Sequence, residues 1–149
     1  TLDTLVAQAT SGAIPSEATG VIARSEATWQ SPQYRFIIPM VDARRMEVYT
    51  AVFENGRQIT ETAPAIIDEN SFAEYLEQGP VFFIGDGAGK CADVIKHPNA
   101  HFCQCWPKAS AMLQPALEAL AAGDFQDVAY FEPFYLKEFV ATVSKKKLF

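Results

Sequence analysis

The sequence predicts an α/β domain in which a mixed sheet is flanked by helices. Two observations indicate this class. Three strand-like segments follow one another directly, and helical and strand-like segments then alternate along the chain. The composition is that of a globular protein, with 49% hydrophobic and 20% charged residues. A chain of 149 residues is long enough for one domain with a substantial core.

The three consecutive strands are expected at residues 36–41, 46–53 and 58–67. The first is a short apolar run, FIIPMV, which is typical of a buried strand, although Pro39 lacks an amide donor. The second is rich in β-branched and aromatic residues. Asn55-Gly56 lies between the second and third segments and predicts a hairpin, because both turn residues must take positive φ.

The period of the pattern then changes from strand to helix. Ser71 and Glu74 fit a capping box at the start of a helix, and Gly79-Pro80 is the signal that ends this helix. The remaining elements are expected as a strand at 81–84, a short helix at about 90–96, a strand at 100–105 and a helix at 112–123. Three antiparallel strands followed by this alternation is the order of the ribonuclease H-like fold, from which actin-like ATPase domains are also built.

The chain divides into four segments by composition. Residues 1–9 have helical spacing, and residues 10–34 are rich in Ser, Thr, Ala, Gly and Pro without periodicity, which indicates a linker or an inserted loop. Residues 35–137 form the predicted domain, and residues 138–149 form a basic tail. The chain starts without Met, so we expect it to be a piece of a longer protein whose preceding domain ends at residues 1–9.

Charge and cysteine content narrow the classes of function. The formal net charge is −6, and an acidic surface repels the phosphates that dominate nucleic-acid affinity, so direct binding of RNA is not expected. Three cysteines without a C-x-x-C pair fit a reducing cytoplasm. No apolar run approaches the roughly 20 residues that a membrane span requires.

Two segments carry a resemblance to a known family. The string IPMVDARRMEVY at residues 38–49 resembles the strand–turn–strand signature that opens the second domain of TsaB proteins, formerly called YeaZ and labelled glycoprotease-like. The string EPFYLK at residues 132–137 is similar to the C-terminal segment of the same family, and a glycine loop follows a buried strand in both. The family motif falls on Asp42, Arg44, Arg45, Glu47, Tyr49, Pro133 and Tyr135, for which structural or interface roles are expected.

The resemblance implies a non-catalytic subunit of the machinery that forms threonylcarbamoyladenosine in tRNA. Such a subunit serves as scaffold or activator of a TsaD-like catalytic partner, assisted by a TsaE-like ATPase, and touches tRNA only indirectly. On this resemblance ATP would be used by the assembled complex, and no cofactor is assigned to this chain itself. A homodimer is a further option. The Ser-Gly-Pro-Gly-Ser-Phe-Thr-Gly type motif of the family's first domain is absent here.

A glycine-rich loop is a candidate site for nucleotide contact. Gly85, Asp86, Gly87, Gly89 and Lys90 follow a predicted strand and could present backbone amides to an anion. The loop is one residue too short for a Walker A motif, and Cys91 stands where Ser or Thr is needed. A tight strand-to-helix turn would also need glycine, and we favour this structural interpretation.

The alternative function is a ribonuclease H-like metal-dependent nuclease or a phosphotransferase. Asp42 at the end of the first strand would then bind metal, with further carboxylates from Glu47, Asp68, Asp86 or Asp93. Nothing in the sequence shows that these side chains converge, so a turn-stabilising role for Asp42 is the preferred hypothesis.

His101, Cys103 and Cys105 alternate along a predicted strand and would share one face. Alternate side chains stand about 6.6 Å apart on a strand, which is too far for one strand to surround a zinc ion. We therefore expect sheet residues that lie partly in the core, and no zinc-protease motif supports the old glycoprotease label.

Overall fold

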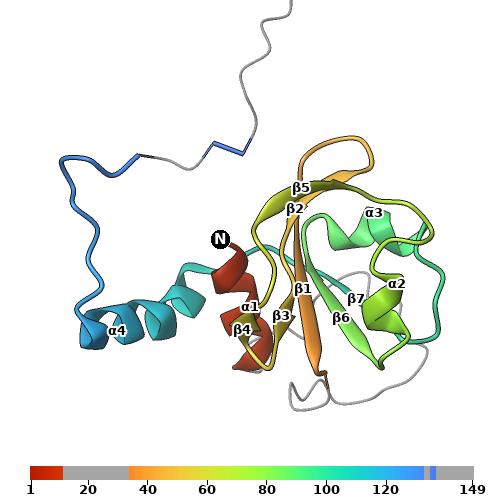
Figure 1. Ribbon diagram of the computed structural model, residues 1–149, viewed down its shortest axis with the longest axis horizontal. Coiled ribbons are helices and arrows are strands. Elements are labelled where there is room, and N and C mark those ends of the chain that lie inside the picture. Colours follow the sequence, from red (N-terminus) through yellow and green to blue (C-terminus); the bar gives the residue numbers. More distant parts are fainter. Residues whose placement is uncertain (12–33, 133–134, 137–149) are drawn as a thin grey trace, which may run out of the picture.

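The computed structural model describes residues 1–11, 34–132 and 135–136. The chain forms an α/β domain with a mixed sheet, as the sequence predicted, and helices lie on both faces of this sheet (Figure 1). No helix within the described residues is long and apolar enough to cross a membrane.

The first half of the sheet is an antiparallel meander. Strand β1 (Phe36–Asp42) pairs with β2 (Glu47–Thr50) and with β3 (Phe53–Glu54) in one continuous register, so β2 and β3 act as a single interrupted strand. Strands β4 (Arg57–Gln58) and β5 (Ala63–Ile66) pair with β3 and β2 in turn and make the third strand of the meander. The three predicted strands are therefore confirmed, although two of them are interrupted.

Both interruptions have a physical cause in the chain. In the register of β1 with β2 and β3, the gap at Ala51 and Val52 lies opposite Pro39, which has no amide to donate to an antiparallel neighbour. Val52 also contacts the segment between β4 and β5. Its amide donates to the Thr60 hydroxyl at 2.7 Å, and Ile59 N donates to Val52 O at 2.8 Å. The side-chain contact replaces a ladder bond and separates β4 from β5.

The predicted hairpin at Asn55-Gly56 is confirmed. Both residues have positive φ, 49° for Asn55 and 79° for Gly56. The pairs Glu54–Arg57 and Phe53–Gln58 enclose this two-residue loop.

The second half of the sheet is parallel. Helix α2 (Ala73–Leu76) leads into β6 (Val81–Gly85), which pairs parallel with β1. Helix α3 (Ala88–Ala92) then leads into β7 (Ala100–Gln104), which pairs parallel with β6. The sheet therefore runs from β4 and β5 through β3 and β2 to β1, β6 and β7.

The start of α2 differs from the prediction. The Ser71 hydroxyl bonds with Asp68, both to its amide and to its carboxylate, instead of capping the helix. Phe72 occupies the N-cap position with φ 64° and offers no capping side chain. The expected capping box with Glu74 is wrong because Ser71 is engaged in the preceding turn.

Two apolar layers form because alternate side chains of each strand point to opposite faces. Ile38, Met40 and Phe83 pack on the face covered by α2 and α3. Ile37 and Ile84 pack on the other face, against helix α1 (Leu2–Thr10). Residues 1–9, which the sequence assigned to the end of a preceding domain, thus supply one outer layer of this sheet (Figure 1).

The described chain continues past β7 into a 3-10 turn, η2 (Ala109–Met112), and helix α4 (Leu113–Ala122). Gly123 ends α4 with φ 68°, as its position in the sequence predicted. Pro115 lies in the first turn of α4, where its missing amide interrupts no hydrogen bond within the helix. No residue of α4 is buried, and the helix lies beside α1 instead of covering the sheet (Figure 1).

Candidate functional site

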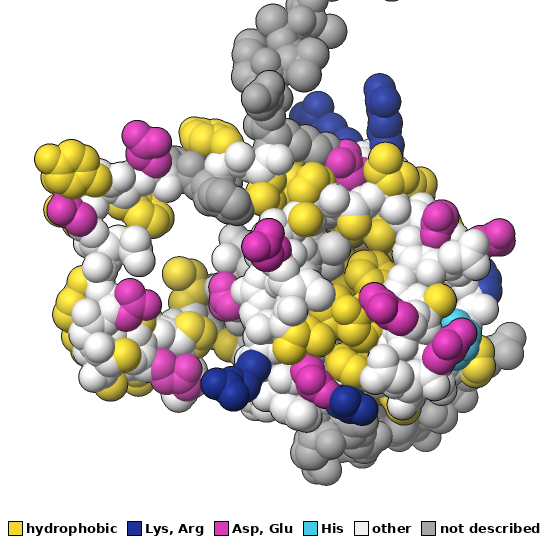
Figure 2. Space-filling view, in the orientation of Figure 1, with side chains coloured by type: hydrophobic (Ala, Val, Ile, Leu, Met, Phe, Trp, Pro, Cys, Tyr) yellow, Lys and Arg dark blue, Asp and Glu magenta, His cyan; other side chains and the backbone are white. Residues whose placement is uncertain are grey.

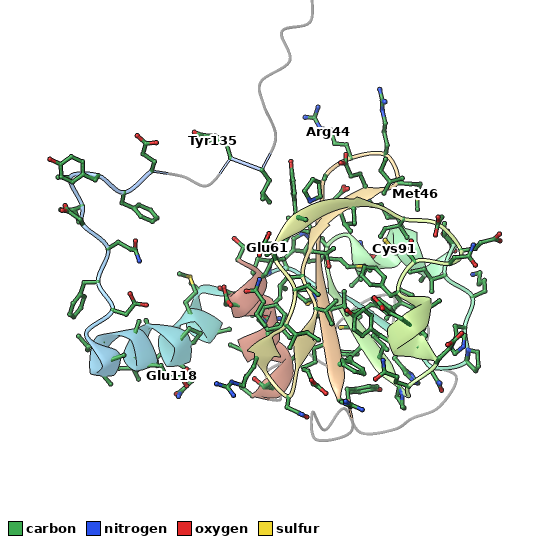
Figure 3. The ribbon with its side chains drawn as sticks, viewed as in Figure 1. Arg44, Met46, Glu61, Cys91, Glu118 and Tyr135 are labelled. Atoms are coloured by element: carbon green, nitrogen blue, oxygen red, sulfur yellow. The ribbon has the colours of Figure 1, made fainter. Side chains whose placement is uncertain are left out.

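The two candidate segments meet at one edge of the sheet. The segment that follows β1 carries Asp42 to Glu47, and the segment that follows β6 carries Gly85 to Lys90. Because β1 and β6 are parallel neighbours, their carboxyl ends lie side by side. Figure 3 shows Arg44 and Met46 in the loop between β1 and β2, with Cys91 in the adjacent α3.

Lys90 connects the two segments. Its ammonium group donates to the Asp42 carboxylate, to Arg45 O at 2.8 Å and to Glu47 O at 2.7 Å. An ammonium group has three donors, so these contacts use all of them. The Lys90 side chain is 24% exposed and that of Asp42 is 45% exposed, so the ion pair lies at the surface.

Asp42 organises the turn on both of its sides. Its carboxylate Oδ1 accepts from the Arg44 amide at 2.8 Å, and its own amide donates to Asp86 Oδ1 at 3.0 Å. The hydrogen bond from Lys90, followed by that from the Arg44 amide, lowers the pKa of the Asp42 carboxyl from its ordinary value. The carboxylate is therefore ionised at neutral pH.

The turn holds Arg44 and Arg45 in an uncommon backbone conformation. Their φ angles are 70° and 51°, in the left-handed region that few residues other than glycine adopt. Ala43 N donates to Glu47 O at 3.0 Å and Glu47 N donates to Arg44 O at 3.2 Å, which closes the turn. Both arginine residues are exposed at its tip.

Three glycines of the second segment have close neighbours. A Cβ on Gly85 would lie 2.1 Å from Met40 O, and Gly85 has φ 136°, where side chains are rarely accommodated. A Cβ on Gly87 would lie 2.9 Å from a Val48 methyl group. Each contact gives its glycine a packing reason that does not depend on a ligand.

Gly89 lies against a residue that the sequence analysis did not single out. A Cβ there would lie 2.5 Å from Gln104 Oε1, at the end of β7. Only the strand order of the folded sheet brings Gln104 to this loop, so no local signal in the sequence could have identified it.

The predicted family motif also includes Tyr49, Tyr135 and Pro133. Tyr49 is in β2, where it pairs with Val41 of β1. Tyr135 is 81% exposed on the segment beyond α4 (Figure 3), and Pro133 lies outside the described residues. Within the described part of the chain, no three His, Cys, Asp or Glu side chains come together as a metal-binding group.

The alternating residues His101, Cys103 and Cys105, in β7 and just beyond its end, share one face, as predicted. Cys103 and Cys105 are buried in the layer beneath α1, and His101 lies 5.2 Å, centroid to centroid, from the ring of Tyr34 on the same side. Fully buried Gln8 of α1 donates to Cys105 Sγ at 3.7 Å and accepts from Lys108 N at 3.1 Å. These contacts give β7 a structural role in fixing α1.

Comparison with known proteins bears on the fold. No family model and no curated protein sequence matches the chain. A crystal structure from Pseudomonas aeruginosa, of an uncharacterized protein with similarity to the peptidase YeaZ, matches with a TM-score of 0.63 and 21% sequence identity. A second structure, YeaZ from the same organism, matches with a TM-score of 0.54 and 20% identity.

Both matches cover 91% of this chain and 56% of the solved one, so the chain spans little more than half the length of these structures. Identity at this level shows a common fold and carries no residue roles. It supports the resemblance to TsaB proteins that the DARRMEVY string indicated. The chain has the fold of the YeaZ structures over nearly its whole length.

Proposed function

We propose that this chain is the second domain of a TsaB-type subunit and serves as a non-catalytic scaffold in the formation of threonylcarbamoyladenosine in tRNA. The YeaZ-like fold supports this proposal, together with the DARRMEVY segment at residues 42–49. On this proposal the protein works in the cytoplasm with a TsaD-like catalytic subunit and a TsaE-like ATPase. It contacts tRNA only through them.

The finer fold class belongs to the same proposal. An antiparallel meander whose first strand, β1, has parallel β6 and β7 on its other side is the arrangement expected of a ribonuclease H-like half of an actin-like architecture. Strand β1 is central in this order, and the candidate site lies at its carboxyl end.

The observation that carries the scaffold role is the engagement of Lys90. Its three donors are bound to oxygens of the β1–β2 turn, which include the Asp42 carboxylate. A lysine committed in this way stabilises the shape of a turn, whereas a phosphate-binding lysine must offer donors to its ligand. The β1–β2 turn exposes Arg44 and Arg45 to solvent, where a partner protein can contact them.

A copurification experiment tests the proposal. The tagged chain is incubated with purified TsaD-like and TsaE-like proteins, and we expect it to retain the TsaD-like subunit. Replacing both tip residues, Arg44→Glu with Arg45→Glu, should weaken retention by at least about tenfold, because it reverses the charge of the contact. Arg57→Glu, at an exposed arginine of β4, is the matched control and should bind normally.

Two results would contradict the proposal. The first is a chain that folds but retains no TsaD-like partner. The second is metal-dependent nuclease or phosphotransferase turnover that Asp42→Ala abolishes without unfolding the protein, since a scaffold residue contributes only to folding and assembly.

A further inference from the structure

Helix α4 exposes an apolar stripe. Leu113, Leu117 and Leu120 follow one another at the spacing that places side chains on one side of a helix. Their exposed fractions are 63%, 48% and 59%, whereas a core leucine such as Leu5 is fully buried. A surface helix normally turns such a stripe toward the protein interior.

The leucine stripe points away from α1, the helix beside which α4 lies. A hollow of about 230 Å³ separates α1 from α4, and the α4 residues that line it are Gln114, Pro115 and Glu118. Successive residues of a helix are about 100° apart, so these three residues occupy a different side of α4 from the leucines. Within the described part of the chain, the stripe therefore has no covering layer.

The segment after α4 extends this apolar surface. Its exposed large apolar residues include Phe125, Val128, Tyr130 and Phe131. A turn holds part of this segment, since Asp127 Oδ1 accepts from Ala129 N at 2.9 Å and Asp127 O accepts from Phe131 N at 2.8 Å. A turn that is already formed reduces the entropy lost on binding. We call the leucine stripe and these four residues the α4 surface.

The charges around the α4 surface are all negative. Residues 109–136 contain no Lys or Arg, and their charged residues are Glu118, Asp124, Asp127 and Glu132. Figure 2 shows acidic side chains interspersed with hydrophobic ones at this end of the molecule. An acidic occupant would be repelled here, so charge complementarity favours an occupant that carries Lys and Arg beside its apolar side chains.

The spacing of the stripe favours a helix as the occupant. Leu117 follows Leu113 by four residues, and Leu120 follows Leu117 by three. Alternating steps of four and three residues are the spacing of the seam along which two helices pack. A narrow stripe of this kind matches the apolar side of one amphipathic helix.

We propose that the α4 surface docks a basic amphipathic helix of a protein partner. The apolar side of that helix covers the leucine stripe, and its Lys and Arg side chains pair with Asp124 and Glu132. The α4 surface lies far from the β1–β2 turn, as the positions of Glu118 and Arg44 in Figure 3 show. Its charge is also opposite to that of the turn, so this inference does not depend on the TsaD-like partner proposed above.

Binding of two synthetic peptides to the full chain tests the proposal. Each fluorescently labelled peptide has about three heptads with leucine at both seam positions, and the flanking positions carry lysine in one peptide and glutamate in the other. Fluorescence anisotropy measures the dissociation constants. We expect the lysine peptide to bind at least about tenfold more tightly than the glutamate peptide, because only the lysine peptide complements the acidic surface.

Variants of the stripe locate the contact. Leu117→Gln and Leu120→Gln should each weaken binding of the lysine peptide at least about tenfold, because an apolar contact is lost at the centre of the interface. Circular dichroism should remain unchanged, since neither side chain is buried. Ile66→Gln is the matched control, because Ile66 is 78% exposed on β5, outside the α4 surface, and this variant should bind normally.

A second pair of variants tests the charges. Asp124→Asn combined with Glu132→Gln should weaken binding of the lysine peptide at least about threefold. Glu69→Gln combined with Asp93→Asn removes the same charge from exposed positions next to α2 and α3, and should leave binding unchanged. Asp127 is kept in both variants because its carboxylate holds the turn.

Three results would overturn the proposal. Equal binding of the two peptides would show that charge does not select the occupant. Unchanged binding in Leu117→Gln and Leu120→Gln would place the contact on another face. A chain that binds neither peptide would leave another domain or a second copy as the occupant of the α4 surface.

Discussion

The ammonium group of Lys90 donates hydrogen bonds to three oxygens of the β1–β2 turn, so this side chain ties the glycine-rich loop to that turn. Glycine spacing after a strand predicts a tight turn correctly, but it does not predict what the following lysine binds. The acceptors of Lys90 come from the β1–β2 turn, more than 40 residues away in the sequence. Contacts between such distant residues follow from strand order, which short motifs do not encode.

Removing the Lys90 ammonium group should destabilise the turn. We expect Lys90→Met to lower the free energy of unfolding by about 1–3 kcal/mol, because the Asp42 carboxylate and two carbonyl groups each lose the hydrogen bond from Lys90. Lys96→Met is the matched control, since Lys96 donates only to Ala92 O within the described contacts, and it should cost less than about 0.5 kcal/mol. Urea denaturation measures both values. Equal effects in the two variants would show that the Lys90 contacts contribute nothing.

Strands and turns with strong local signals were predictable, and interruptions and helix starts were not. The FIIPMV run and the Asn55-Gly56 turn fall where the sequence placed them, because burial and positive φ leave few alternatives for these residues. The short helix α3 begins at Ala88 instead of about residue 90, and α2 begins without its expected cap. At α2 the cause is the Ser71 hydroxyl, which is engaged with Asp68 in the preceding turn.

Gly85, at the end of β6, offers a test of how closely β6 approaches β1. Gly85 and Gly79 have similar φ angles, 136° and 149°, but only Gly85 has a close neighbour for an added Cβ. Gly79→Ala should therefore show only the backbone strain, about 1–3 kcal/mol. Gly85→Ala should cost at least about 2 kcal/mol more, because Met40 O must move. Thermal or urea unfolding of the pair measures the difference, and similar losses would rule out the close approach.

At the scale of the whole molecule, the sheet is enclosed on both faces although most of its helices are short. Helix α1 covers one face, and α2 and α3 cover the other. The three cysteines are all buried: Cys103 and Cys105 lie beneath α1, and Cys91 belongs to α3 and packs in the layer on the other face of the sheet. The sequence predicted that Cys103 of β7 and Cys105 just beyond it lie partly in the core, because they alternate on one face. The helix that covers them could not be assigned from sequence spacing.

This enclosure should protect the thiols from reagents. Burial raises the pKa of the Cys91 thiol to about 11, so the reactive thiolate is scarce as well as inaccessible. We expect no cysteine to react with an aromatic disulfide reagent in the native protein and all three to react in denaturant. The measurement is a spectrophotometric thiol count with and without guanidinium. Rapid reaction of a thiol in the native state would contradict the observed packing.

Gln8 links the beginning of the chain to its later part, since it bonds with both Cys105 and Lys108. A ribosome synthesises the chain from its N-terminus, so helix α1 emerges long before β7 exists to receive it. During translation the apolar face of α1 therefore remains exposed until β7 has been synthesised, and the sheet beneath α1 remains accessible to water. The last strand of the sheet therefore sets the moment at which the domain can close, and a pause in translation before it would prolong the interval in which chaperones can bind.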